Sequence, residues 1–242
     1  MLNKYVRFWL FLKITIVITI VVVMVPTITF FYFLMSKPTE GTKEYLIEHG
    51  WIKGQPFDVN LGSVTLRIPT GRNFSVYTKG RIVKGQADSI AFTILYHKFF
   101  DHPEIELPNE SLGWMSDGLM RIKVSGGGYA DPIKRDRQIE QWSWGKISEL
   151  PVLGLIEYQS PQFDVSGHMT YVALNDSDRT PAGSLIRYSC QSYPPGKISR
   201  CMSFYTIPGL AHVGFSFKAP LLPFWKVVNR DVVNFVSTLI IK

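Results

Sequence analysis

The hydrophobic residues of this chain follow three patterns, and the first is an unbroken uncharged run, Ile14–Met35. Its length matches the roughly 20 residues that a helix needs to cross the hydrocarbon core of a membrane. Basic residues without acidic neighbours precede it, at Lys4, Arg7 and Lys13, and such an excess is typical of a cytoplasmic flank. The run ends in bulky residues that give a signal peptidase no small-residue site. We therefore expect a cytoplasmic N-terminus (1–13), an uncleaved transmembrane signal-anchor (14–35) and an exported remainder.

The second pattern is alternation of apolar and polar residues in short segments, which predicts strands with one buried face. It begins after a polar tether (36–56) that holds a short predicted helix, Lys43–Trp51. The predicted strands are Phe57–Leu61, Val64–Ile68, Phe74–Tyr77, Asp88–Tyr96, Leu119–Ser125, Gln141–Ile147, Leu153–Gln159, Met169–Leu174, Leu185–Gln191, Ile198–Tyr205 and His212–Phe217.

The third pattern is a helical stripe near the end of the chain, beginning after Pro223, which suits a first helical turn. The apolar stripe consists of Trp225, Val228, Val232, Phe235 and Leu239, and the residues predicted to face outward are Lys226, Asn229, Arg230, Asn234 and Thr238. The three patterns together predict an α+β fold class. An N-terminal transmembrane helix is followed by one mostly antiparallel β domain (57–242), a sheet or a sandwich, which a C-terminal amphipathic helix closes.

The two cysteines, Cys190 and Cys201, lie in two predicted strands that are joined by the turn-forming segment Ser192–Lys197. A hairpin would bring the two sulfur atoms together, and an exported domain meets an oxidising compartment. We therefore expect a disulfide. The alternative is a pair of buried thiols in a reducing compartment.

Charge and motifs exclude several functions. Without residues 1–35 the chain has 23 basic and 19 acidic residues, and this net charge of +4 is too mild for a nucleic-acid-binding protein, which usually carries a concentrated basic stripe. The five histidines show no metal-ligand spacing, and no nucleophile elbow or phosphate-binding loop is present. Ser143 and Lys146 match S-x-x-K, but in a strand their side chains would point to opposite faces. We therefore predict no catalytic residue, no cofactor and no metal.

Two stretches of the chain resemble one family of proteins. The run Leu66–Pro69 followed by Asn73–Phe74, and the later run of Cys201–Phe204, Val213–Phe217 and Leu222–Ile241, are similar to segments of periplasmic immunity proteins of type VI secretion effectors. The resemblance implies an inhibitor that binds a toxic effector hydrolase, a phospholipase or a peptidoglycan-targeting enzyme, and covers its active site. It also implies a single-pass inner-membrane protein whose C-terminal domain is periplasmic.

Such an inhibitor needs a contact surface with a charged rim. The candidates are two loops, an acidic loop (Phe99–Gly113) and a charged loop (Asp131–Arg137). Their partner-binding candidates are Asp101, His102, Glu104, Glu106, Lys134, Arg135 and Arg137.

Two other interpretations remain open. One is a bitopic structural or interaction subunit of a cell-envelope complex. The other is a type II membrane glycoprotein, because Asn73, Asn109 and Asn175 each begin an N-x-S/T sequon.

Overall fold

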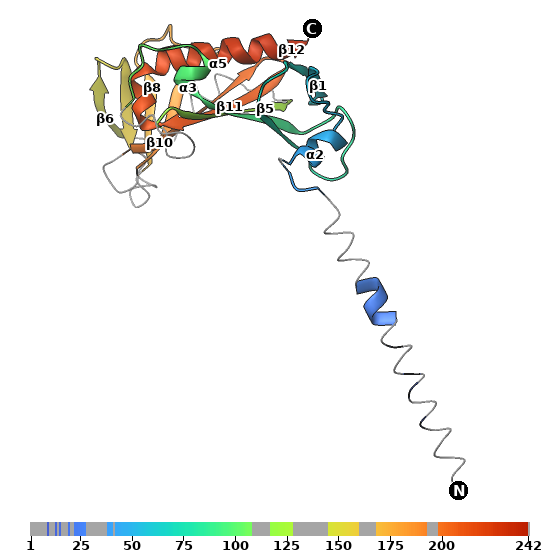
Figure 1. The fold of residues 1–242 in the computed structure, drawn as a ribbon. Helices are drawn as coiled ribbons and strands as arrows, with labels where there is room; N and C mark the ends of the chain where they lie inside the picture. The colour runs from blue at the N-terminus through green and yellow to red at the C-terminus, as the bar shows by residue number, and fades with distance from the viewer. Residues whose placement is uncertain are drawn as a thin grey trace. The chain divides into compact units, whose positions relative to one another are not determined.

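The structure is a computed structural model of the whole chain, shown in Figure 1. It describes residues 9, 13, 15, 19, 22–27, 38–40, 42–107, 117–127, 145–159, 168–192 and 198–241. The chain divides into two compact units, Met1–Tyr45 and Leu46–Lys242, which are considered separately below.

The sequence predicted a transmembrane helix in the first unit. No helix in the described part of the chain is long and apolar enough to cross a membrane. Thr27 does donate a hydrogen bond to the carbonyl of Val23 at 2.6 Å, as expected for a helical threonine. The predictions of an N-terminal transmembrane helix in the fold class and of single-pass inner-membrane anchoring through Ile14–Met35 are therefore wrong.

The second unit is built mostly from antiparallel β-strands with few helices. Nine strands form a large sheet in the order β3-β4-β5-β11-β10-β9-β8-β7-β6. Their bounds are β3 Phe74–Tyr77, β4 Ser89–Leu95, β5 Leu119–Gly126, β6 Gly145–Leu150, β7 Leu155–Gln159, β8 His168–Ala173, β9 Arg187–Ser192, β10 Ile198–Ile207 and β11 Ala211–Lys218.

A second, smaller sheet lies at one end of the large one (Figure 1). It has the order β1-β2-β12, from β1 Phe57–Asn60, β2 Thr65–Ile68 and β12 Ile240–Ile241. The remaining elements are helical: α2 Lys43–Glu48, α3 Tyr96–Phe99, the 3-10 helix η2 Ala219–Phe224 and α5 Trp225–Leu239.

Helix α5 covers one face of the large sheet (Figure 1). Its stripe residues Trp225, Val228, Val232, Phe235 and Leu239 are all buried, as their spacing predicted. Phe235 meets Phe92 of β4 edge to face at 5.1 Å between ring centroids, and Trp225 meets Tyr188 of β9 at 6.1 Å. The apolar core of the domain therefore lies between α5 and one face of the large sheet. The opposite face of the sheet does not contact α5.

Most of the predicted strands appear close to their expected places, and Phe74–Tyr77 has the same bounds in the structure as β3. Some details differ. Asn229 was expected to face outward but is buried, with 8% of its surface exposed. Pro223 lies in η2 rather than in the first turn of α5. The first four residues of the predicted strand Gln141–Ile147 lie outside the described residues, and β6 begins at Gly145.

A disulfide joins Cys190 of β9 to Cys201 of β10, as the hairpin pattern predicted. The two residues are direct partners in the antiparallel register, and both are fully buried. Closing a loop of this size stabilises a protein by about 2–3 kcal/mol, chiefly through the unfolded chain.

Candidate functional site

The face of the large sheet opposite α5 is the first candidate site. Along β5 the buried residues Met120, Ile122 and Val124 point toward α5, so the alternating residues Arg121 and Lys123 point to the other face. The antiparallel register places Ser216 and Gly214 of β11 beside them. Further along the same rows lie Met202 and Phe204 of β10.

A groove of about 610 Å³ crosses this face over strands β5, β11 and β10, and we call it the open-face groove. It is lined by Arg121, Lys123, Ser125, Arg200, Met202, Phe204, His212, Val213, Gly214, Phe215 and Ser216. Among the described residues, the lining contains three cationic side chains, Arg121, Lys123 and Arg200, and no carboxylate. The groove is therefore an electropositive surface with an apolar floor.

Neutral oxygen atoms and an aromatic ring hold these cations in place. The guanidinium of Arg121 donates a hydrogen bond to the hydroxyl of Tyr77 at 2.7 Å, and that of Arg200 donates to the hydroxyl of Ser216 at 2.6 Å. The ammonium group of Lys123 lies 5.5 Å from the centre of the Tyr77 ring. These contacts fix the direction of the charges without neutralising them.

Phe204 supplies the aromatic part of the groove. Its side chain is 49% exposed although it lies in the middle of β10, in an inner strand of the sheet. It lies directly opposite Gly214, where a Cβ atom would approach the ring to 2.9 Å. The absence of a side chain at Gly214 therefore lets the Phe204 ring lie over β11.

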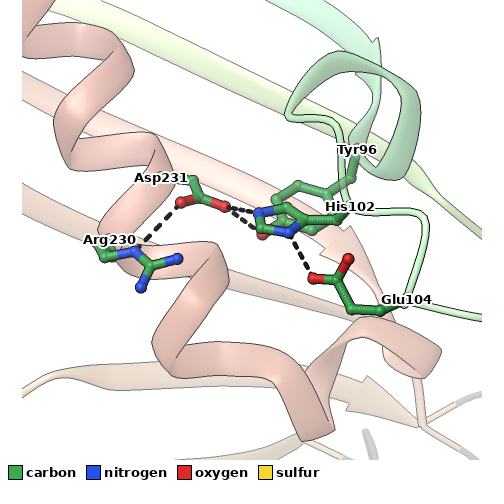
Figure 2. A network of polar contacts seen from close by, with 5 residues as sticks. All are labelled: Tyr96, His102, Glu104, Arg230 and Asp231. Carbon is green, nitrogen blue, oxygen red and sulfur yellow. Dashed lines mark hydrogen bonds and ion pairs between the residues drawn. The ribbon is translucent and has the colours of Figure 1, made fainter.

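The second candidate site is a network of polar contacts around Asp231 of α5, shown in Figure 2. One carboxylate oxygen, Oδ2, accepts hydrogen bonds from the hydroxyl of Tyr96 at 2.6 Å and from Nε2 of His102 at 2.7 Å. The other ring nitrogen of His102, Nδ1, lies 2.7 Å from Oε1 of Glu104. Arg230 approaches the second oxygen of Asp231 at 3.4 Å. We call these five residues the Asp231 network.

Burial and hydrogen bonding act in opposite directions on His102. Burial disfavours the charged ring, but the hydrogen bonds to Asp231 and Glu104 outweigh it and raise the pKa of His102 above its usual value. For Glu104, a hydrogen bond from its own backbone amide and the contact with His102 lower the pKa. For Tyr96, burial and the nearby Asp231 raise the pKa well above its usual range, so the hydroxyl keeps its proton.

This arrangement does not suit catalysis. Both ring nitrogens of His102 face carboxylates, so in the charged form neither offers the lone pair that a general base needs. His97, the other histidine near the acidic loop, has both ring nitrogens buried without a hydrogen-bond partner. Among the described residues, no group of three or more His, Cys, Asp or Glu side chains could hold a metal ion. The Asp231 network is best understood as a structural tie between α5 and the acidic loop.

The predicted partner-binding residues differ in how exposed they are and in whether the structure describes them. Asp101, Glu104 and Glu106 are exposed, while Ile105 and Leu107 between and beyond them are buried. His102 is turned inward, with 16% of its side chain exposed. The other three candidates, Lys134, Arg135 and Arg137, lie outside the described residues.

Sequence reasoning missed the open-face groove and Asp231. The alternation along β5 did show that Arg121 and Lys123 share a face, but Arg200 joins them only through the order β5-β11-β10. Asp231 and His102 are separated by 129 residues, so no local pattern connects them.

Comparison with known proteins gives limited information. No family model matches the chain, and no curated protein matches it. One solved structure is similar to it: Smlt3025, described as an immunity protein of the Stenotrophomonas maltophilia type IV secretion system. The match has 15% identity and a TM-score of 0.46, and it covers 78% of this chain and 94% of that chain. A likeness of this degree does not establish a shared fold or a shared role.

The Asp231 network predicts a pH-dependent stability. Because the folded pKa of His102 is raised, its contribution is fully present below the unfolded pKa, about 6.5, and is lost as the pH rises through the folded pKa. We expect the difference in unfolding free energy between the wild type and His102→Gln to be larger at about pH 6 than at about pH 8.5. Urea denaturation at a series of pH values measures it.

Glu104→Gln is the matched control for this measurement. Glu104, whose side chain is 65% exposed, is the outer partner of His102. Replacing it leaves the contact between His102 and Asp231 in place, so we expect a much smaller change in the free energy of unfolding at every pH. A His102→Gln difference that is constant across the series would show that His102 does not change its protonation in this range.

Proposed function

We propose that this protein is an immunity protein that binds a toxic effector hydrolase, a phospholipase or a peptidoglycan-targeting enzyme, and blocks its active site without catalysing a reaction itself. The observation that carries the proposal is the open-face groove. It combines three fixed cations with a half-exposed aromatic ring on a rigid sheet. Arginine and large aromatic side chains are the residues that most often dominate protein–protein binding energy.

The polar groups of the described residues support binding over chemistry. The most perturbed histidine, His102, is engaged by carboxylates on both sides. The open-face groove contains His212, but its Nδ1 lies 2.9 Å from the hydroxyl of Thr206, and no carboxylate orients it among the lining residues. An enzyme would need a nucleophile, a base and an orienting group within reach of one another.

The sequence resemblance to immunity proteins of type VI secretion effectors supports the same role. Two of the segments that carry it, Cys201–Phe204 and Val213–Phe217, form parts of β10 and β11. These strands supply most of the groove lining, including Phe204 and Gly214. The resemblance and the candidate surface therefore fall on the same part of the fold.

A genetic experiment tests the proposal. The gene for this chain is deleted alone and together with any adjacent gene that encodes a hydrolase. We expect the single deletion to cause self-intoxication, the double deletion to restore growth, and a plasmid copy of this chain to protect the single mutant.

A biochemical experiment completes the test. The purified chain is added to the purified hydrolase at equimolar concentration, and substrate turnover is measured. We expect turnover to fall in proportion to the fraction of hydrolase bound. Normal growth of the single deletion, together with unchanged turnover of the hydrolase, would overturn the proposal.

A further inference from the structure

We infer that the open-face groove binds an extended acidic segment of the effector, one that places carboxylates against Arg121, Lys123 and Arg200 and an apolar side chain on Phe204. This inference rests on the proposed function and specifies its contact surface. It is independent of the acidic loop, from which the sequence predicted the contact.

The first argument is charge. Elsewhere in the described part of the domain, several cationic side chains pair with carboxylates, as in Arg67–Asp58, Lys226–Asp178 and Arg230–Asp231. The groove cations instead contact the hydroxyl of Tyr77, the hydroxyl of Ser216 and the aromatic face of Tyr77. Three cations on neighbouring strands repel one another, and a carboxylate that binds between them relieves this repulsion. The groove therefore favours a partner with negative charge.

The second argument is spacing. Arg121 and Lys123 are two residues apart on β5, so their Cα atoms lie about 7 Å apart. Side chains on one face of an extended peptide repeat at the same interval. Arg200 lies two strands away on β10, about 10 Å across the sheet. An extended segment that lies along β5, with acidic residues at alternate positions, therefore places one carboxylate against each of the two β5 cations. A further carboxylate of the same segment reaches Arg200.

The third argument concerns the apolar position. Lys123, Gly214 and Phe204 form one row across β5, β11 and β10. The Phe204 ring covers Gly214, and Lys123 lies at the other end of the row. A segment that crosses here buries an apolar side chain against the exposed part of the ring while a carboxylate meets the ammonium group, and removing apolar surface from water favours binding.

The fourth argument is preorganisation. The hydrogen bonds to Tyr77 and Ser216 hold the guanidinium groups of Arg121 and Arg200 before any partner arrives. Ordering a flexible side chain at an interface opposes binding, and these two side chains are already held in place in the unbound domain.

A polypeptide fits the groove better than a nucleic acid does. Single-stranded nucleic acid is usually held by several aromatic side chains on which successive bases stack, whereas the groove lining holds one exposed ring, Phe204. Whether a lipid surface competes for these cations is decided by the vesicle probe.

The test uses three probes of defined chemistry: poly-L-glutamate, a single-stranded oligothymidylate, and vesicles that contain phosphatidylglycerol. Binding of each to the full chain is measured at low salt and near physiological salt. We expect binding of poly-L-glutamate that weakens with salt, because the contacts are exposed charges. Tighter binding of oligothymidylate or of vesicles than of poly-L-glutamate would overturn the inference.

Charge reversal locates the site. The variant Arg121→Glu with Lys123→Glu should weaken poly-L-glutamate binding at least about tenfold. The matched control, Lys53→Glu with Lys84→Glu, makes the same change in net charge at two exposed loop positions and should change binding by no more than about twofold. Equal losses in both variants would overturn the inference. Arg200→Glu is made as a second groove variant, so that a folding defect in the first does not decide the result.

The same variants separate this inference from the proposed function. If the wild type protects cells from the hydrolase and the groove variants do not, the proposed function and this inference are both supported. If folded groove variants protect as well as the wild type, the effector binds elsewhere and the inference fails while the proposed function stands. If the wild type itself gives no protection, the proposed function fails.

Discussion

Replacing Trp225 by alanine is expected to lower the free energy of unfolding by about 3–5 kcal/mol, the usual cost of removing a large buried aromatic side chain. Trp225 is 1% exposed and is the largest fully buried side chain among the described residues. Its indole N–H donates a hydrogen bond to the carbonyl of Leu153 at 2.6 Å, and its ring contacts Tyr188. The change therefore creates a cavity and also leaves a carbonyl without its donor. The midpoint of urea denaturation measures the effect.

Two variants make this prediction specific. Trp225→Phe keeps most of the apolar volume but removes the donor to Leu153, so we expect a smaller loss, about 1–3 kcal/mol. Asn234→Ala changes an exposed position of the same helix and should stay within about 0.5 kcal/mol of the wild type. A Trp225→Ala variant as stable as Asn234→Ala would show that α5 does not pack on the sheet as described.

Replacing Gly126 by alanine is expected to destabilise the domain by about 3 kcal/mol or more, at the upper end of the cost of overpacking. Gly126 is the last residue of β5, and a Cβ atom there would lie 1.4 Å from the carbonyl oxygen of Leu61. The clash is with backbone, so it is relieved only by moving the 61–64 loop away from the large sheet. That loop is also held by Ser63, whose hydroxyl donates to the carbonyl of Leu210.

Gly214→Ala is the matched control because it makes the same substitution in a neighbouring strand. The added Cβ atom would meet only the ring of Phe204, at 2.9 Å, and an exposed ring can rotate away. We expect a loss of about 1 kcal/mol or less. Equal denaturation midpoints for Gly126→Ala and Gly214→Ala would contradict the close approach of Leu61 to β5.

The local elements were largely predictable because their causes are local. Alternation located β1 and β2, since Phe57, Val59, Leu66 and Ile68 all point into the core. The stripe on α5 predicted the buried face of that helix. Asn229 was the exception, because it lies four residues after Trp225 and three before Val232, at the border of the apolar stripe, and is buried although it is polar.

The first unit shows where a local pattern misleads. Ile14–Met35 has the composition of a membrane span, but apolar composition alone does not establish a spanning helix. In the described residues, no helix of sufficient length is present.

The candidate sites were less predictable because strand order makes them. The open-face groove depends on β5 lying beside β11, and nothing in the sequence of β5 indicates which strand will pair with it. The acidic loop was found from its charge, but its tie to α5 through Asp231 was not, since Asp231 is one acidic residue on a helix surface. The sequence therefore predicts which residues share a face more readily than which faces meet.

The strand order of the large sheet has a consequence for how the domain assembles. Every neighbouring pair of its described strands joins strands that follow one another in the chain, except β5 and β11. The sheet thus consists of two meanders, β3–β5 and β6–β11, and every loop closure within a meander is shorter than the one that pairs β5 with β11. Loop-closure entropy makes the distant β5–β11 pairing the slow event. Since that seam runs through the groove, a partner bound there joins the two meanders and opposes their separation.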